Sequence, residues 1–516
     1  MERFRILILP AVFALVFLTC LTGCRGREGQ GRAPDEFIVG LEGAPASLDP
    51  RYATDAYGVR IIPLLFNGLL TEEPSGALVP DLAERWENPD PLTHRLTLKK
   101  NVRFHDGSPF SSKDVKATFS YVMDPANGCP SAGSLKALSS VETPDGYTVV
   151  FRLKEPFVSF PYQLRQGILP ERLAGKKDLG EELTGTGPFK LDRIKPGEEI
   201  TLLPNPECYR GAPLVEGLRF RILGNATTRL LELKSGGIDL LQNAVPPYSV
   251  KFLEREENLK IIRAPGPSYQ YLGFNLEDKI VGDAKVRRAI AHALDRKSLI
   301  EFVLQGQARP AKALFSPEHI AFAPGAEEIP FDLEEAKTLL DSAGYPDPDG
   351  DGPAMRFSLS YKTSSDKTAN EVAQVIANQL RRAGIGVEVR SFEWGTFFGD
   401  VKKGNFQMMS LRWIGLTDPD VLHYIFHSSS VPPAGANRGR VRDAEIDAWL
   451  DASRSEPDFS KRMELYRKAQ EKAASECYYV SLWWLDNVVV MNRGFDGFTP
   501  YPGGEYTSLA KVRRVR

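Results

Sequence analysis

The chain has 516 residues, 42% of them hydrophobic and 26% charged, which is the composition of a globular protein large enough to bury more than one core. It carries 65 basic and 67 acidic residues, which gives a net charge of −2, and it has no basic excess. These values exclude a protein that binds nucleic acid through a strongly basic surface.

The first 34 residues have the form of an export signal followed by a tether. Arg3 and Arg5 precede an apolar run over 6–18, which is too short to span a bilayer comfortably. The segment Leu21-Thr-Gly-Cys24 resembles a lipoprotein box, with cleavage before Cys24 and a lipid on its thiol. We therefore expect a signal peptide over 1–23, a flexible tether over 24–33 and an exported soluble body, anchored to a membrane by lipid alone. An uncleaved membrane anchor is the alternative.

The first folded segments are predicted to alternate strands and helices. Residues 37–39 predict a strand, and the nearly continuous apolar run over 61–70 predicts a helix that is buried on most sides. A short helical segment is expected to begin at Pro80 and to carry Leu82 and Trp86. It should end soon after Trp86, because the proline-rich run that follows interrupts helices.

The next segments predict a strand, a turn and a capped helix. Apolar and polar residues alternate over 96–104, which is typical of a strand with one buried face. Ser111 and Asp114 have the spacing of a capping box, and the helix that follows has one apolar face. That face is formed by Val115, Phe119 and Val122. With a further strand over 148–153, the region of about 80–180 predicts a self-contained α+β subdomain.

Several motifs of this chain resemble those of one protein family. The longest are LVPDLAERW at 78–86 and LTLKKNVRFHDGSPFSSKDV at 96–115. Shorter motifs are SLDP at 47–50, GTGPF at 185–189, NPECYRGAP at 205–213, YQYLGFN at 269–275 and VRRAIAHALDR at 286–296. The chain resembles the family 5 extracellular solute-binding proteins, which are the dipeptide- and oligopeptide-binding lipoproteins of bacterial ABC importers.

The glycine-rich segment 185–189 has a second interpretation as a phosphate-binding loop. Such a loop needs free backbone N–H groups at the start of a helix. Pro188 has no N–H, and residues 189–191 predict a strand. We therefore predict a turn that leads into the main sheet.

The second half of the chain predicts an α/β lobe. A strand over 269–275 precedes a helix that begins at Asp283, and Asp295 caps the next helix. Residues 355–391 have the periodicity of two parallel strands joined by a helix, with Gly384 at the end of that helix. A further strand is expected over 478–491.

Two patterns suit a metal ion but lack part of the ligand set. Asp347-Pro-Asp-Gly-Asp-Gly352 has the first positions of a calcium loop, yet Ser358 stands where a bidentate glutamate is needed. His423 and His427 lie on one helical face, but no third ligand is evident nearby in the sequence. We expect a surface turn and structural histidines, and hence no metal and no cofactor.

No motif of the chain indicates an enzyme. The G-x-S-x-G nucleophile elbow is absent, and so is Ser-x-x-Lys with its supporting motifs. We therefore predict no catalytic residues.

Three cysteines follow the export segment: Cys129, Cys208 and Cys477. They form no C-x-x-C pair, and at most one disulfide can form among them.

The resemblance implies a two-lobed α/β fold of the type II periplasmic-binding-protein kind, with the extra α+β subdomain in lobe I. Lobe I would span 34–270 and 483–516, and lobe II 271–482, with two strands crossing at a hinge. Such a protein is a monomer that captures a peptide or similar solute outside the membrane and delivers it to ABC permease subunits. An exported lipid-anchored hydrolase and a scaffold or signalling subunit without a transported ligand are the alternatives.

The resemblance also implies where the ligand binds. The segments EWGTF at 393–397 and WIGLTDP at 413–419 are similar to those that form pockets for a peptide lying between the lobes. Tryptophans on loops after strands suit this role, because aromatic rings give a large contact area; burial of both in the core is the alternative. The expected ligand-binding residues are Gly43, Ala44, Pro45, Tyr269, Tyr271, Trp394, Phe398, Arg412, Trp413, Ile414, Gly415 and Asp418.

One position departs from the family pattern. Peptide-binding members place an aspartate three residues after the tryptophan that matches Trp413, where its carboxylate holds the ammonium group of the peptide. Here that position is Leu416, and an apolar side chain cannot neutralise a desolvated ammonium ion. Asp418 either takes over the role or caps the helix that follows. The mismatch predicts a ligand that does not depend on a free N-terminal amine.

Overall fold

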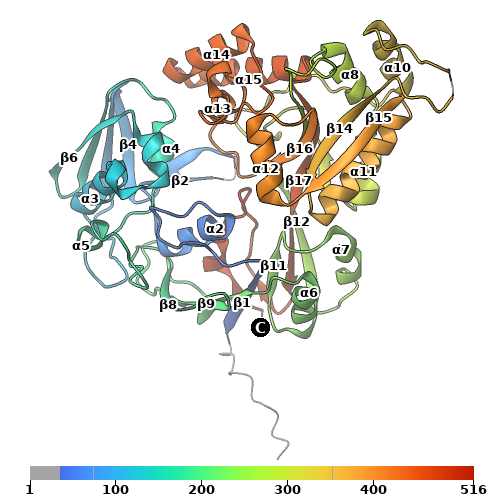
Figure 1. Ribbon diagram of the computed structural model, residues 1–516. Helices are drawn as coiled ribbons and strands as arrows, with labels where there is room; N and C mark the ends of the chain where they lie inside the picture. Colours follow the sequence, from blue (N-terminus) through green and yellow to red (C-terminus); the bar gives the residue numbers. More distant parts are fainter. Residues whose placement is uncertain (1–34, 74, 351, 516) are drawn as a thin grey trace, which may run out of the picture.

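The computed structural model describes residues 35–73, 75–350 and 352–515. The predicted signal peptide, Cys24 and the tether lie outside these residues. The chain forms two lobes joined by a shared sheet, and a smaller unit extends from the first lobe (Figure 1). This is the two-lobed α/β fold that the sequence predicts.

One large sheet runs through both lobes. Its strands are β1 (Glu36–Leu41), β8 (Phe189–Lys195), β9 (Glu199–Pro204), β10 (Gly217–Ile222), β11 (Leu240–Gln242), β12 (Leu259–Phe274), β13 (Ala308–Pro310), β14 (Phe357–Ser364), β15 (Ile385–Phe392), β16 (Met408–Trp413) and β17 (Tyr479–Asn492). The order is β15-β14-β16-β12-β17-β11-β1-β10-β9-β8, and β13 pairs with β17 beside this path. The strands predicted over 37–39, 189–191, 269–275 and 478–491 are confirmed.

The antiparallel strands β12 and β17 cross from one lobe to the other. Their register shifts between Ala264 and Ser268. On one side of this bulge β17 pairs with β11, and on the other side β12 pairs with β16. Gly266 lies within the bulge, where a Cβ atom would come 2.2 Å from the carbonyl oxygen of Leu485. The pairing partners of the two strands therefore change at a bulge that also brings their backbones close together.

The smaller unit is an antiparallel sheet covered by a helix. Its strands, in the order β4-β5-β7-β6, are β4 (Ala83–Asp90), β5 (Thr93–Leu98), β7 (Thr148–Leu153) and β6 (Leu138–Asp145); the hairpin β2 (Leu70–Glu72) and β3 (Leu78–Pro80) precedes them. Helix α3 (Ser112–Met123) begins at the predicted capping box, where the Asp114 carboxylate accepts the Ser111 N–H at 2.8 Å. The unit buries its own apolar core, which confirms an α+β subdomain.

Three local predictions in this part of the chain are wrong. The segment around Trp86 is not helical, because it pairs with β5 as the edge strand β4, where Pro89 does not break a ladder on both sides. Helix α2 (Ala56–Leu65) ends before Leu70, because the N–H groups of Leu69 and Leu70 donate to the carbonyl of Leu164 instead of continuing the helix. Residues 102–104 make only an isolated bridge, so the predicted strand ends at 98.

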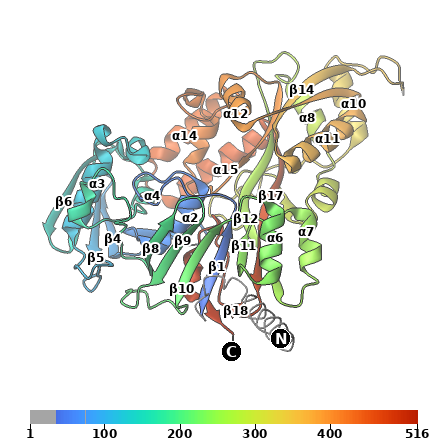
Figure 2. The same ribbon diagram turned by 60° about the horizontal axis from the view of Figure 1, so that its bottom comes forward.

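The helices cover both faces of the large sheet. In lobe I, α2 packs on one face, and α6 and α7 pack together on the other (Figure 2). In lobe II, α11 connects the parallel strands β14 and β15, and Gly384 follows it with a φ of +81°, as predicted. The remaining helices are α4 (Phe160–Gln163), α5 (Glu171–Ala174), α6 (Ala226–Ser235), α7 (Pro247–Leu253), α8 (Ala284–His292), α9 (Arg296–Ser298), α10 (Leu333–Ser342), α11 (Lys367–Arg381), α12 (Trp394–Lys403), α13 (Val421–Phe426), α14 (Ala444–Ser455) and α15 (Phe459–Ser475), and the C-terminal pair is β18 (Phe495–Asp496) with β19 (Arg513–Arg514).

Two further predictions concern cysteines and membrane spans. Cys129, Cys208 and Cys477 are buried free thiols, so the one disulfide that the sequence allowed does not form among them. In the described part of the chain, none of the helices combines the length and apolar character needed to cross a bilayer.

Candidate functional site

Strand β16 has an open edge where the two lobes meet. It pairs with β12 along its length, from Phe274–Met408 to Tyr269–Trp413. Its pairing with β14 on the other side ends at Lys362–Met409, so the backbone from 410 to 413 has no strand partner there among the described residues. An edge of this kind can accept the extended backbone of a peptide as an added strand.

Arg412 is the charged residue on this open edge. Its side chain is exposed to solvent between the lobes. The protein around the guanidinium group nevertheless displaces part of its water, and this desolvation lowers its pKa. Arg60 lowers the pKa further, whereas Asp366 and Glu42 raise it. None of the described residues forms an ion pair or hydrogen bond with the guanidinium group. Arg412 is therefore a cation between the lobes with no direct partner of opposite charge.

Three of the predicted aromatic residues are brought together by an arginine that the sequence analysis missed. The ring of Trp394 stacks on Phe398 at 5.3 Å between centroids. The guanidinium carbon of Arg438 lies 5.2 Å from the centroid of Phe398 and 4.5 Å from that of Trp413. Trp394 is 54% exposed, and Trp413 has a buried indole N–H without an acceptor among the described residues. This cation–aromatic stack offers both an apolar surface and an unused donor.

The sequence predicts that both tryptophans lie on loops, but neither does. Trp394 begins α12 and Trp413 ends β16. Tyr269 and Tyr271 are buried in the core of lobe II, where Tyr271 stacks on Tyr479 at 3.9 Å. Only the backbones of these two tyrosines face the edge strand, through their pairing with β16.

The lobe I residues expected at the ligand lie in the loop that follows β1. Ala44 is exposed and Gly43 and Pro45 are half-buried. A Cβ atom on Gly43 would come 2.9 Å from the ring of Tyr57, so a larger residue at this position would displace that ring. On the opposite lobe, Ile414 is 49% exposed and Gly415 has a φ of +65°.

Asp418 joins the two lobes. The Ser159 hydroxyl of the subdomain donates to its Oδ1 at 3.0 Å, and the Asp420 N–H donates to the same oxygen at 2.9 Å. Burial, with a smaller effect of the Asp420 charge, raises the pKa of Asp418 to about 7. The carboxylate thus bonds to the start of α13 and also reaches across to lobe I, while Leu416 is 6% exposed within the core.

Further polar contacts lie near Asp418, and one of them, between Arg165 and Thr417, crosses between the lobes. Arg165 donates to the Thr417 hydroxyl at 3.3 Å and forms an ion pair with Glu72 at 2.5 Å. Burial raises the pKa of Glu72 to about 6. His319 contacts the Thr417 carbonyl at 2.9 Å, and burial lowers its pKa to about 4. No sequence motif pointed to these contacts of Arg165 and His319, because they join residues far apart in the chain.

The sequence matches the model of the family "Bacterial extracellular solute-binding proteins, family 5 Middle" over residues 77–432. The chain belongs to this family. It is 28% identical to the oligopeptide-binding protein AppA of Bacillus subtilis, over 99% of both chains. The predicted resemblance is therefore confirmed.

Solved structures of related proteins have the same fold. The structure of AppA from Bacillus subtilis in complex with a nonapeptide has a TM-score of 0.77 at 26% identity and covers 93% of this chain and 99% of that one. DppA from Helicobacter pylori in complex with the peptide STSA gives 0.76 at 27% identity, covering 93% and 98%. AgaA from A. tumefaciens R10 in complex with agropinic acid gives 0.73 at 25% identity, covering 93% and 99%.

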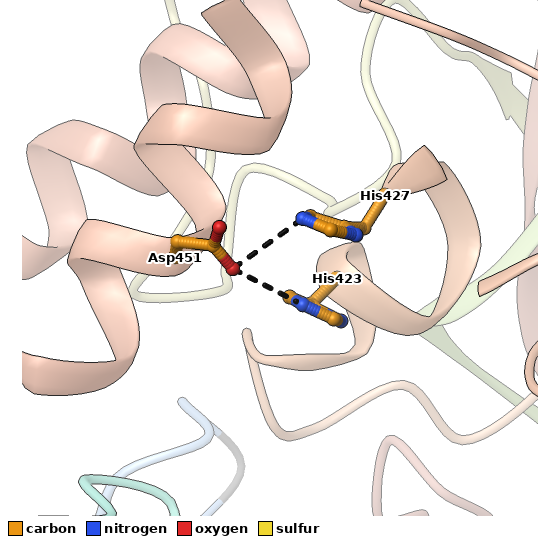
Figure 3. Close-up of side chains that lie close together, drawn as sticks. All are labelled: His423, His427 and Asp451. Carbon is orange, nitrogen blue, oxygen red and sulfur yellow. Dashed lines mark ion pairs between the residues drawn. The ribbon is translucent and has the colours of Figure 1, made fainter. Parts of the chain in front are cut away.

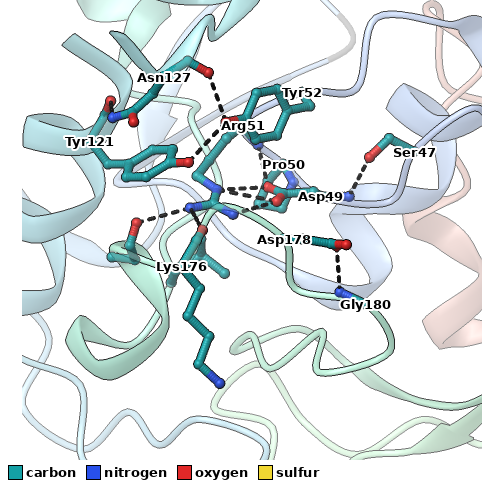
Figure 4. A network of polar contacts seen from close by, with 12 residues as sticks. Ser47, Asp49, Pro50, Arg51, Tyr52, Tyr121, Asn127, Lys176, Asp178 and Gly180 are labelled. Atoms are coloured by element: carbon teal, nitrogen blue, oxygen red, sulfur yellow. Dashed lines mark hydrogen bonds and ion pairs between the residues drawn. The ribbon is translucent and has the colours of Figure 1, made fainter. Parts of the chain in front are cut away.

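In this family 5 protein the SLDP segment has a structural role. The Asp49 carboxylate accepts hydrogen bonds from the guanidinium group of Arg51, which is 1% exposed. Arg51 also donates to the carbonyls of Ala174 and Lys176 at 2.9 and 2.8 Å, and its guanidinium carbon lies 4.3 Å from the ring centroid of Tyr121 (Figure 4). This network ties the segment after β1 to the subdomain.

A large cavity lies mainly in lobe I, beside the predicted site. It has a volume of about 1140 Å³ and is lined by α2, the β2–β3 hairpin and residues near the C-terminus. Thr417 is its one lining residue from lobe II, and none of the twelve predicted ligand-binding residues lines it. The cavity therefore reaches the junction of the lobes next to Asp418 but is not formed by the predicted site.

One cluster of side chains has the composition of a metal site. His423 and His427 come together with Asp451 of α14, so the third group that the sequence lacked nearby is supplied 24 residues further on. The calcium-like pattern gives no comparable cluster, since Asp347 and Asp349 lie in the loop before β14, Asp351 is outside the described residues, and Ser358 lies within the strand.

Proposed function

We propose that this protein is the solute-binding subunit of a bacterial ABC importer and that its solute is a peptide or a related oligomer with a negatively charged group. Arg412 carries the proposal, because a guanidinium group without a partner lies beside the open edge of β16. A ligand carboxylate supplies the missing charge, and the ligand backbone pairs with the edge. Relatives with this fold hold peptides and agropinic acid, so either class of ligand is compatible with it.

Mass spectrometry of whatever co-purifies with the protein tests this function. We expect a peptide or another oligomeric acid, recovered intact, which binds again in calorimetry after its removal. A solute that is returned cleaved would favour the lipid-anchored hydrolase. No thermal shift across a broad solute library would favour a scaffold or signalling subunit.

We also propose that the chain is exported and held at an extracytoplasmic membrane face by a lipid on Cys24. The apolar run and Leu21-Thr-Gly-Cys24 support this localisation. The Cys24→Ala variant should be released from membranes or remain unprocessed, as seen by fractionation and mass. Cleavage and membrane retention as in the wild type would contradict the proposal.

We further propose that a monomer closes lobe I (34–270 and 483–516) over lobe II (271–482) when the solute binds. The bulge in β12 and the separate cores on its two sides support a hinge there. Small-angle scattering should give a smaller radius of gyration at saturation with the solute. An unchanged radius would indicate a fixed groove.

A further inference from the structure

His423, His427 and Asp451 converge at the contact between α13 and α14 (Figure 3). Asp451 Oδ1 lies 3.5 Å from His423 Nε2 and 3.3 Å from His427 Nε2. The histidines are 8% and 9% exposed, whereas Asp451 is exposed at the surface. Their rings are stacked with centroids 4.1 Å apart, as the spacing of four residues on one helical face allows.

The two distances from Asp451 Oδ1 match edges of a tetrahedral coordination sphere. Nitrogen and oxygen ligands bound to one Zn²⁺ at about 2.0–2.2 Å are about 3.3–3.6 Å apart when the angles are tetrahedral. All three ligand atoms lie within 4.8 Å of one another. A single ion can contact all three if the two stacked rings turn out of their parallel arrangement so that their Nε2 lone pairs converge.

The histidine rings have partners that orient them for metal binding. His427 Nδ1 accepts the Ser429 backbone N–H at 3.1 Å and lies 2.7 Å from the Ser429 hydroxyl, and His423 Nδ1 lies 3.4 Å from the Ser430 hydroxyl. An Nδ1–H that donates to the neighbouring hydroxyl leaves the lone pair of Nε2 free for a metal, and in His427 this requires the ring proton to move from Nε2 to Nδ1 and the Ser429 N–H to give up its bond. His427 Nε2 is buried and has no hydrogen-bond partner among the described residues, which is uncommon for a buried polar atom.

The surrounding charges favour a cation. A second carboxylate, that of Asp447, lies 3.8 Å from His427 Nε2. The nearby guanidinium group of Arg454 is neutralised by two hydrogen bonds of 2.8 Å to Asp420.

We propose that His423, His427 and Asp451 bind a divalent transition-metal ion of the Zn²⁺ class, at a site separate from the solute-binding edge. Two imidazoles and a carboxylate suit Zn²⁺ far better than Ca²⁺ or Mg²⁺, which prefer oxygen ligands. The ion links the end of α13 to α14, and water occupies the remaining position on the exposed side of Asp451. The site thereby stabilises the segment that follows the inter-lobe residue Asp418.

Metal titration of the chelator-treated full-length protein tests the site. We expect one equivalent of Zn²⁺ to bind by calorimetry and to raise the thermal midpoint, and one equivalent of Co²⁺ to give the visible absorption of tetrahedral coordination. His427→Gln should lower the affinity at least about 100-fold, since removing groups behind the ligands already costs about 10–100-fold. Ser429→Ala should lower it about tenfold for the same reason.

Two further variants keep the test decisive. Asp451→Asn changes only an exposed side chain, so it should fold normally and still bind Zn²⁺ at least about tenfold more weakly. His292→Gln is the matched control, because it removes another histidine of lobe II, which contacts the Pro330 carbonyl, and should leave Zn²⁺ affinity unchanged. No stoichiometric binding to the wild type, or equal binding to wild type and Asp451→Asn, would overturn the proposal.

Discussion

The surroundings of two arginines, Arg51 and Arg412, divide the molecule into a region built for stability and one left open for a ligand. Arg51 is completely enclosed and bonds to the Asp49 carboxylate and to two backbone carbonyls. Arg412 is exposed between the lobes and has no such partner among the described residues. The family motif SLDP thus accounts for the structural arginine, whereas the arginine without a partner marks the functional edge.

The difference shows how an unpaired charge identifies a site. Arg412 keeps contact with solvent, so leaving it unpaired costs the fold little, and the protein around it supplies no counter-charge in direct contact. Such a residue is expected where a ligand supplies the counter-charge. Four changes test this contrast, beginning with the one expected to have the largest effect.

Arg51→Met should destabilise the protein by about 3–5 kcal/mol, because it leaves the Asp49 carboxylate buried without its partner. Urea unfolding measures this loss. The control is Arg85→Met, since that arginine is exposed on β4 and its nearest carboxylate is 3.8 Å away, so a change within about 0.5 kcal/mol is expected. A loss below about 1 kcal/mol for Arg51→Met would show that the network is not essential to the fold.

Arg412→Met should lower affinity for the co-purified solute by about 10–100-fold, because a hydrogen bond to a charged group contributes about 1.5–3 kcal/mol. The thermal midpoint of the ligand-free protein should not fall, since no ion pair is lost. Calorimetry and thermal unfolding measure the two effects separately. Arg381→Met, on an exposed turn of α11, is the matched control and should change neither. Unchanged affinity in Arg412→Met would remove the basis for a negatively charged ligand.

Asp418→Asn should gain stability relative to the wild type as the pH rises from about 4 to 7. The folded pKa of about 7 is above the ordinary value, so the wild type is most stable while Asp418 is protonated and loses that stability as the pH rises through 7. A full effect would be about 1.4 kcal/mol for each unit by which folding raises the pKa of Asp418. We expect a smaller gain in the free energy of unfolding, about 1–2 kcal/mol in total, because the side chain keeps some contact with solvent.

The comparison of the two proteins isolates Asp418 from its titrating neighbours. Glu72, with a raised pKa, acts in the same direction, and His319, with a lowered pKa, acts in the opposite direction, but both are present in each protein. Urea unfolding at several pH values provides the measurement, and Asp192→Asn, an exposed change, should give a flat difference. A flat difference for Asp418→Asn as well would contradict a raised pKa.

Much of the fold could be predicted because its signals are local. The βαβ unit over 355–391 and the capping box at Ser111 depend on periodicity and short-range hydrogen bonds, and both formed as expected. Where a distant segment competes for backbone groups, prediction failed. Leu164 ends α2 through its carbonyl, and β5 pairs with the segment that was expected to be helical around Trp86.

The candidate site shows the same division. Motif similarity brought Trp394 and Trp413 into consideration, but the contacts of Arg438 with Phe398 and Trp413 depend on packing that has no sequence signal. Ser159 lies 259 residues from Asp418, and Asp451 lies on a different helix from the two histidines. Charge pairing and ligand sets of this kind appear only when the chain is folded.

The smallest expected effect concerns the amino end of a peptide ligand. Leu416 is buried in the core, and Asp418 is already bonded to Ser159 and is only half ionised near pH 7, so neither holds an ammonium group firmly. Peptides of the co-purified composition should therefore bind with free and acetylated amino ends within about threefold of each other, a difference below about 0.7 kcal/mol. Amidation of the carboxyl end should instead weaken binding at least about tenfold, because it removes the charge that Arg412 needs. Calorimetry on the four matched peptides measures both ends. A strong preference for the free amine that Asp418→Asn abolishes would show that Asp418 leaves Ser159 to bind the ligand, and that the charge missing from Leu416 has moved two residues along the chain.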